Sequence, residues 1–341
     1  MFSTLAQSEG KVRSALPRPA GAGLAADQGG VADHSSYGAA VEPAREERMA
    51  SAFRRLVHWV APSAAVVIGP LLLFGCGGPK KEALPTGAGG PPRGGGKVQH
   101  IGLYDAAGAT FFLTTSDRPN KAEVTFTFGP KGPHLMAVSG DWNGDGAVTV
   151  GLYSADAATF LLTDSNRSQK ADYTLSFGAR GKKLYPLAGD WDGDGRWSVG
   201  LYSPADGAFF LTNSMKPGKA DVHFFFGRRG ASDIRPVAGD WDGDGKWGVG
   251  LYSSTSGTFF LINSLKPGKA DITFRFGSAG MKALPVCGDW TGDGRTKIGL
   301  YLPAAGAFFL RNSLAPGKAD TMISFGPKDR QLQPIAGNWA Q

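Results

Sequence analysis

The chain repeats one short unit five times, and this repetition constrains its fold more than any other feature. A GLY-type tripeptide begins each unit, and a Phe-rich triplet, an FG pair and a Gly-Asx-Trp triplet follow it. The tripeptide recurs at spacings of 49, 49, 50 and 49 residues, starting at Gly102, Gly151, Gly200, Gly250 and Gly299. A unit this short cannot bury its apolar face alone, so neighbouring units must pack on one another.

Each unit has the pattern of four short strands. In the third unit, alternating apolar residues rich in aromatic and β-branched types predict strands within 197–203, 207–214, 220–227 and 234–241. Pro, Gly and Asp separate these segments, and no segment has a useful helical period. The chain contains 51 glycines and 22 prolines, as many short turns require.

Five four-stranded units predict an all-β fold, a five-bladed β-propeller over residues 97–341. The recurring glycine of VGLY is expected to let strands crowd near the central axis. A linear solenoid of β-units is the alternative, but open arrays normally need atypical capping units, which this sequence lacks. The pattern leaves open whether the ring closes by a shared blade or by contact between the first and last blades.

An acidic loop follows the fourth strand of each of the first four units. Its copies are DWNGDG at 141–146, DWDGDG at 190–195 and 240–245, and DWTGDG at 289–294, with a truncated fifth at Asn338 and Trp339. We expect these four loops to join five blades. Alternating carboxylates on a backbone turned by glycine offer the oxygen ligands that Ca²⁺ prefers. The twelfth position is leucine in every copy, so these loops are not EF-hands.

The pattern GDWDGDG…VGLY resembles the FG-GAP or VCBS-type repeats of integrin-like β-propellers, and the resemblance covers residues 97–341. It implies Ca²⁺ ligands at Asp141, Asn143, Asp145, Asp190, Asp192, Asp194, Asp240, Asp242, Asp244, Asp289 and Asp293. The ninth loop position departs from the family pattern in every copy, being Thr149, Ser198, Gly248 or Lys297. Thr291 and Lys297 predict that the fourth site is the weakest.

Two structural alternatives accompany the acidic loop. Asp and Asn also cap turns by accepting backbone N–H bonds, so a metal-free turn explains the same residues. The tryptophan of each loop either packs between neighbouring blades, which its recurrence favours, or lies exposed for stacking on sugars.

The first 96 residues have the pattern of a leader. We expect residues 1–48 to be a disordered extension or to precede the true start at Met49. Residues 49–76 combine two arginines, an apolar core and LFGC, which resembles a bacterial lipobox with Cys76 as the lipidated residue, although Phe74 departs from the usual small residue. Residues 77–96 form a Gly/Pro-rich linker. We therefore expect a lipid-anchored protein of the bacterial envelope, or a secreted one if the lipobox is not used.

The remaining composition excludes some function classes and favours others. From Lys97 onward, 26 Lys and Arg stand against 22 Asp and Glu, so no nucleic-acid partner is expected. The histidines occupy unrelated repeat positions, and Cys287 is expected to be a small buried residue. The polar hairpin with Asn213, Lys219 and Asp221 is interpreted as a turn, or alternatively as a multivalent surface.

We therefore predict a monomeric, non-enzymatic, Ca²⁺-binding module for a protein or glycan partner. The alternatives are a lectin with one sugar site per blade and a propeller-fold enzyme acting on polysaccharides.

Overall fold

The computed structural model describes residues 96–167 and 170–339 of the 341-residue chain. This part contains twenty β-strands and no helix, and so no helix long and apolar enough to span a membrane is found in it. The predicted signal peptide with Cys76, and the linker up to residue 95, lie outside the described residues.

The strands form five antiparallel sheets, the blades, and in each blade four strands follow one another from the centre outward. Blade 1 contains β20 (Gln333–Gly337), β1 (His100–Asp105), β2 (Thr110–Leu113) and β3 (Val124–Thr127). Blade 2 contains β4 (Leu135–Gly140), β5 (Thr149–Ser154), β6 (Thr159–Leu162) and β7 (Tyr173–Ser176). Blade 3 contains β8 (Tyr185–Gly189), β9 (Ser198–Ser203), β10 (Ala208–Leu211) and β11 (Val222–Phe225). Blade 4 contains β12 (Ile234–Gly239), β13 (Gly248–Ser253), β14 (Thr258–Ile262) and β15 (Ile272–Arg275), and blade 5 contains β16 (Leu284–Gly288), β17 (Lys297–Leu302), β18 (Ala307–Arg311) and β19 (Thr321–Ser324).

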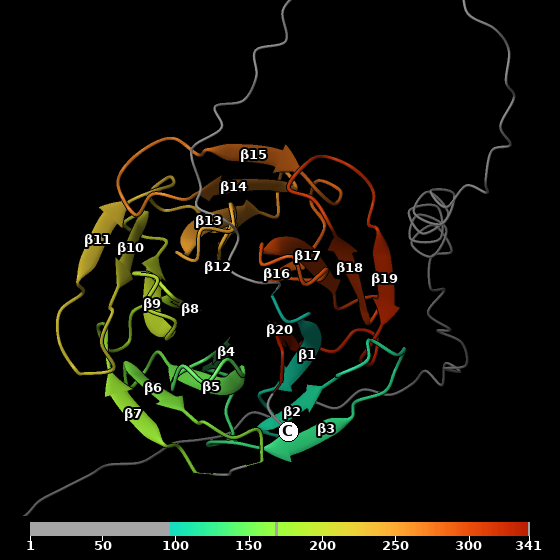
Figure 1. The fold of residues 1–341 in the computed structure, drawn as a ribbon, viewed down its shortest axis with the longest axis horizontal. Helices are drawn as coiled ribbons and strands as arrows, with labels where there is room; N and C mark the ends of the chain where they lie inside the picture. Colours follow the sequence, from blue (N-terminus) through green and yellow to red (C-terminus); the bar gives the residue numbers. More distant parts are fainter. Residues whose placement is uncertain (1–95, 168–169, 340–341) are drawn as a thin grey trace, which may run out of the picture. The chain divides into compact units, whose positions relative to one another are not determined.

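The five blades form a closed ring. The innermost strands β20, β4, β8, β12 and β16 surround the centre, and each contacts the innermost strands of both neighbouring blades. The outermost strands β3, β7, β11, β15 and β19 lie at the rim (Figure 1). The predicted five-bladed β-propeller is therefore confirmed.

The ring closes by a blade shared between the two ends of the propeller. β20 pairs with β1, with Ala336 opposite Ile101. The same shift of one strand occurs in every blade, since the fourth strand of each sequence unit pairs with the first strand of the next, as in Val138 opposite Gly151. Blades and sequence units are therefore offset by one strand.

This offset corrects the predicted position of the acidic loops. Acidic loops 1 to 4 (141–146, 190–195, 240–245 and 289–294) connect the innermost strand to the second strand within blades 2 to 5. They are not the chain segments that lead from one blade to the next. The prediction was wrong because it took the sequence unit for the blade.

The glycine of VGLY also has a different role from the predicted one. It lies on the second strand of its blade and not at the central axis. A Cβ atom at Gly200 would come within 2.5 Å of the Leu211 side chain on β10. The glycine therefore makes room for a leucine of the neighbouring strand.

The hydrophobic core is divided into five clusters, each lying mainly between two adjacent blades. Between blades 3 and 4, Tyr202 and Phe209 pack in one cluster with Val249 and Leu251. The loop tryptophans belong to these clusters; Trp142, Trp191, Trp241 and Trp339 are buried and Trp290 is partly buried. This burial fits packing between blades.

The shared blade predicts that the last strand is essential for stability. Deleting residues 333–341 removes β20 and the buried side chains of Ile335 and Trp339. Removing one large aromatic side chain from a core costs about 3–5 kcal/mol, within a total stability of about 5–15 kcal/mol. We expect the shortened full-length chain to lose its cooperative transition in denaturant, followed by circular dichroism. Deleting only residues 340–341 is the control, and equal stability of the two truncated chains would contradict the shared-blade closure.

Candidate functional site

The first aspartate organises each acidic loop. In loop 2, Asp190 Oδ1 accepts hydrogen bonds from the backbone N–H of Gly193 at 2.7 Å and Asp194 at 3.1 Å, and Oδ2 accepts one from Gly195 at 2.8 Å. Gly195 has a φ of 93°, a conformation that favours glycine. Asp141, Asp240 and Asp289 make the same three contacts in loops 1, 3 and 4. The first aspartate therefore caps the turn through backbone N–H bonds, as the metal-free alternative predicts.

The same aspartate connects its blade to the next one through its backbone carbonyl. Asp141 O accepts a hydrogen bond from Trp197 N at 2.8 Å, and Asp190 O accepts one from Trp247 N at 2.8 Å. The remaining bonds of this cycle are Thr296 N to Asp240 O, Gln99 N to Asp289 O and Val148 N to Asn338 O. Each acidic loop is therefore a hairpin within one blade that also holds the adjacent blade.

Loops 2 and 3 each collect three carboxylates. One oxygen each from Asp190, Asp192 and Asp194 lies within 4.8 Å of the others, and Asp240, Asp242 and Asp244 form an equivalent group. The first aspartate of each group is buried and the other two are exposed. Three carboxylates at this separation form a donor set suited to a hard cation.

Loop 1 differs because an amide replaces the middle carboxylate. Asn143 Nδ2 donates a hydrogen bond to Asp145 Oδ2 at 3.0 Å, and Asn143 Oδ1 accepts one from Asp145 N. The predicted ligands Asp141, Asn143 and Asp145 therefore lie together, with one carboxylate fewer.

Loop 4 contains its own cation. The buried Lys297 ammonium donates to Asp289 Oδ1 at 3.1 Å, to Asp293 Oδ1, and to the backbone carbonyl of Arg295 at 2.9 Å. These acceptors belong to the first, fifth and seventh loop positions. The seventh-position carbonyls of loops 2 and 3 belong to Arg196 and Lys246, and EF-hand loops also use a seventh-position carbonyl. Lys297 therefore holds a positive charge among the donors that a metal ion would use in the other loops.

The carboxyl pKa values reflect this difference. Burial, together with the nearby charges of Asp244 and Asp242, raises the pKa of Asp240 to about 6. Burial likewise raises the pKa of Asp141 and Asp190. In loop 4, burial again acts to raise the carboxyl pKa, but the hydrogen bond and charge of Lys297, together with hydrogen bonds from Arg295 N and Thr291, outweigh burial and lower the pKa of Asp293. The carboxylates of loops 1 to 3 thus lack the compensating charge of loop 4.

The polar hairpin residues have a structural role. Asp221 Oδ2 accepts hydrogen bonds from Thr212 Oγ1 at 3.0 Å and from Asn213 N at 2.8 Å, which close the loop. Asp172 makes the same pair of contacts in blade 2. These contacts fit the turn interpretation. Cys287 is half-buried on β16, and burial raises the pKa of its thiol.

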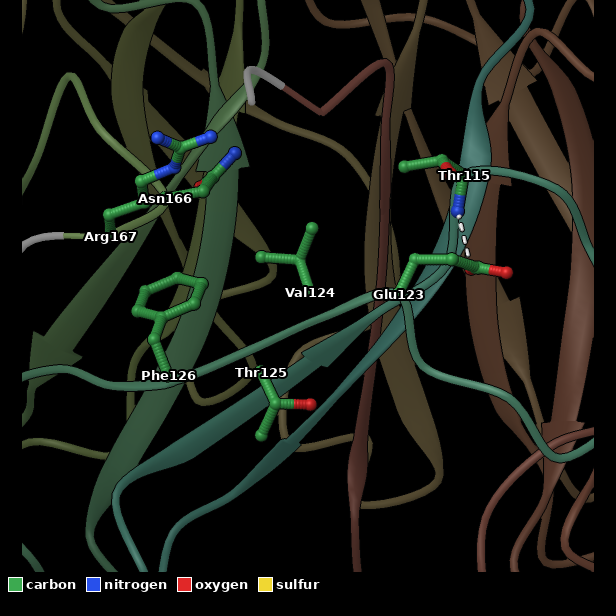
Figure 2. A pocket seen from close by; sticks show the side chains of 7 residues that line it. All are labelled: Thr115, Glu123, Val124, Thr125, Phe126, Asn166 and Arg167. Carbon is green, nitrogen blue, oxygen red and sulfur yellow. Dashed lines mark hydrogen bonds between the residues drawn. The ribbon is translucent and has the colours of Figure 1, made fainter.

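A groove of about 590 Å³ lies at the rim where blade 1 meets blade 2. Figure 2 shows Thr115 and Glu123 at one side, Asn166 and Arg167 at the other with Phe126 below them, and Val124 and Thr125 between the two sides. The sequence prediction missed these residues. The available signal was their departure from the other repeats, for example Glu123 where the other units have Asp.

Comparison with known proteins adds little to these observations. No protein-family model matches the chain, and no curated protein matches it. Among solved structures, BBS1N in complex with ARL6DN shares 11% identity over 70% of this chain and 76% of that chain, with a TM-score of 0.35. An Agrocybe aegerita lectin specific for non-reducing terminal N-acetylglucosamine shares 14% identity over 67% of this chain and 66% of the lectin, with a TM-score of 0.38.

The V. cholerae biofilm matrix protein Bap1 shares 15% identity over 70% of this chain, with a TM-score of 0.28, and the chain spans 41% of its length. Similarities this low carry no functional argument. The resemblance to FG-GAP or VCBS-type repeats therefore stays a prediction, and the propeller assignment rests on the sheets of this chain.

The raised pKa of Asp240 predicts a pH dependence of stability in the presence of chelator. The folded-state pKa of about 6 lies above the ordinary value of 3.8, so the folded state binds more protons between these two values. Ionisation of Asp240 therefore removes stability as the pH rises through this window. We expect the free energy of unfolding of the wild type, relative to Asp240→Asn, to fall from about pH 4 to pH 7.

Urea denaturation of both full-length proteins at several pH values measures this difference. The asparagine offers an amide N–H opposite Gly245 N, which lowers stability equally at every pH, so only the change with pH is informative. Parallel curves would contradict the raised pKa.

Proposed function

We propose that the chain is a calcium-stabilised binding module of the cell envelope, with loops 2 and 3 as its principal Ca²⁺ sites. The observation that carries the calcium proposal is Lys297, because one loop of the set already holds a cation among equivalent donors. Ca²⁺ accepts six to eight oxygen ligands, and three carboxylates, a seventh-position carbonyl and water supply such a shell. Bound there, the ion would offset two of the three negative charges and stiffen a loop that contacts the next blade.

The architecture supports binding as the module's activity. A closed ring of blades presents a rigid frame, and functional residues on such frames commonly lie on the connecting loops. Here the acidic loops and the long hairpin loops emerge at the same ends of their strands, as the hydrogen bond from Asn263 Nδ2 to Asp242 Oδ2 at 2.9 Å illustrates in blade 4. The lipobox-like leader around Cys76 supports display on the envelope.

The calcium proposal predicts a metal-dependent melting temperature. With a dissociation constant of about 10⁻⁴–10⁻³ M, typical of extracellular modules, about 10 mM Ca²⁺ stabilises each site by about 1.4–2.7 kcal/mol. The full-length chain should therefore melt at a higher temperature in Ca²⁺ than in EDTA. The double variant Asp194→Asn/Asp244→Asn should lose most of this increase, and an unchanged melt across millimolar Ca²⁺ would overturn the proposal.

Loop 4 provides two matched controls for this measurement. Asp293→Asn weakens the contact with Lys297, so it should lower the melting temperature and leave the response to Ca²⁺ intact. Lys297→Ser introduces the residue that loop 2 carries at the same position. This variant should be less stable than the wild type in EDTA and should regain stability in Ca²⁺, because its carboxylates would then need an external cation.

Binding to envelope or cell surfaces tests the module itself. The fluorescently labelled full-length chain should bind immobilised cell-surface preparations in a saturable manner and more tightly in Ca²⁺ than in EDTA. Pretreating the surface with periodate or with protease identifies a glycan or a protein partner, respectively. Absence of saturable binding across a broad panel of bacterial and host surfaces would contradict the binding role and leave the calcium measurement unaffected.

A further inference from the structure

The groove between blades 1 and 2 exists where the fivefold pattern of the propeller is interrupted. The loop between the third and outermost strands carries an apolar residue in blades 3 to 5, namely Met215, Leu265 and Leu314. Each of them packs in the cluster shared with the preceding blade. Blade 2 has Asn166 at this position, and Asn166 Nδ2 donates to Val148 O at 3.1 Å.

The exchange coincides with a partly exposed aromatic ring on blade 1. At the third position of the outermost strand, Leu175, Phe224 and Phe274 are only 1%, 2% and 4% exposed. Phe126 on β3 occupies the same position and is only partly buried. At the junction of blades 5 and 1, Ile323 at this position remains 2% exposed. Among the five blades, only blade 1 therefore has a partly exposed aromatic ring at the third position of its outermost strand, and this ring lies at the junction with blade 2.

The two sides of the groove carry opposite charges. Glu123 replaces the aspartate of the other units, and its carboxylate accepts hydrogen bonds from Thr115 N at 3.0 Å and Ser116 Oγ at 2.6 Å. The hydrogen bonds from Ser116 and Thr115 lower the pKa of Glu123 to about 2. The carboxylate thus stays ionised, acts only as an acceptor, and keeps acceptor capacity for a ligand. The exposed Arg167 lines the opposite side of the groove (Figure 2).

The chemistry of this lining matches a hydroxyl-bearing ring. Each sugar hydroxyl both donates and accepts, so hydroxyls on different edges of one ring can donate to Glu123 and accept from Arg167, which only donates. The apolar face of a pyranose fits a partly exposed aromatic ring, and Thr125 adds a further hydroxyl. The volume of about 590 Å³ lies within the range of small-molecule sites, roughly 300–1,000 Å³.

We propose that this groove is a single glycan-binding site, which holds one neutral pyranose unit against Phe126 between Glu123 and Arg167. The inference rests on the proposed binding role and names its ligand class. It differs from a lectin with one site per blade, since Asn166 in the loop and a partly buried ring at the third position of the outermost strand come together at the junction of blades 1 and 2.

A glycan array probed with the labelled full-length chain tests the proposal. We expect binding to glycans with a neutral pyranose that carries free hydroxyls on different edges of the ring. Titration with the methyl glycoside of the strongest ligand then measures the affinity. Glu123→Gln and Phe126→Leu should each weaken binding by at least about tenfold, the effect of losing one charge-assisted hydrogen bond or one ring contact.

Asn166→Leu is the most selective variant, because it restores the residue found in blades 4 and 5. It should fill the groove and abolish glycan binding, and Met215→Leu is the matched control that should bind as the wild type does. Because Asn166→Leu leaves Val148 O without its amide donor, its melting temperature is measured in parallel. The exposed Glu123→Gln keeps the test decisive if that variant unfolds.

Three results would overturn the proposal. An array without ligands would do so, and persistent protease-sensitive surface binding would then show that the module binds a protein. Glycan binding unchanged in Glu123→Gln, Phe126→Leu and Asn166→Leu would place the sugar elsewhere and leave the binding role intact. Preferential binding of a free amino acid over every methyl glycoside would assign the charged pair to a zwitterion.

Discussion

The first aspartate of the acidic loop is the contact on which the ring depends. Its carboxylate accepts three backbone N–H bonds within its own hairpin, and its carbonyl accepts one from the adjacent blade, as Asp190 does from Trp247 at 2.8 Å. Loop shape and blade spacing are therefore set by one residue. Asn338 makes the equivalent carbonyl contact in blade 1, where its O atom accepts from Val148 N.

This double role explains why charge in the loop affects the whole ring. In loops 2 and 3 a buried carboxylate, hydrogen-bonded only to neutral N–H groups, lies beside two further carboxylates. Burial, together with the charges of these neighbours, raises the pKa of Asp240. In loop 4 the ammonium of Lys297 removes that cost without a metal ion. The loops thus share one backbone geometry but differ in how their negative charge is compensated.

Much of the fold could be predicted from the sequence, because five copies of each landmark reveal strand positions independently of any one copy. The pairing of strands could not be predicted in the same way. The fourth strand of a unit fits equally well beside the first strand of its own unit and beside the first strand of the next unit. Only the closure of β20 on β1 decides between them. The positions of the aspartates in the loop were predictable from their spacing. The contact between the Lys297 ammonium and Asp289 was not, because it depends on β17 beginning at Lys297.

In a repeat protein, contacts shared by all units and specific recognition place opposite demands on the sequence. Residues that recur, such as the buried tyrosines and tryptophans, satisfy packing that every blade junction shares. A ligand that is bound once needs a junction that differs from the others. The junction between blades 1 and 2 is of this kind. It has Glu123 in place of aspartate, the partly exposed ring of Phe126, and Asn166 in place of an apolar side chain. Their departure from the repeat is therefore the more informative signal of function.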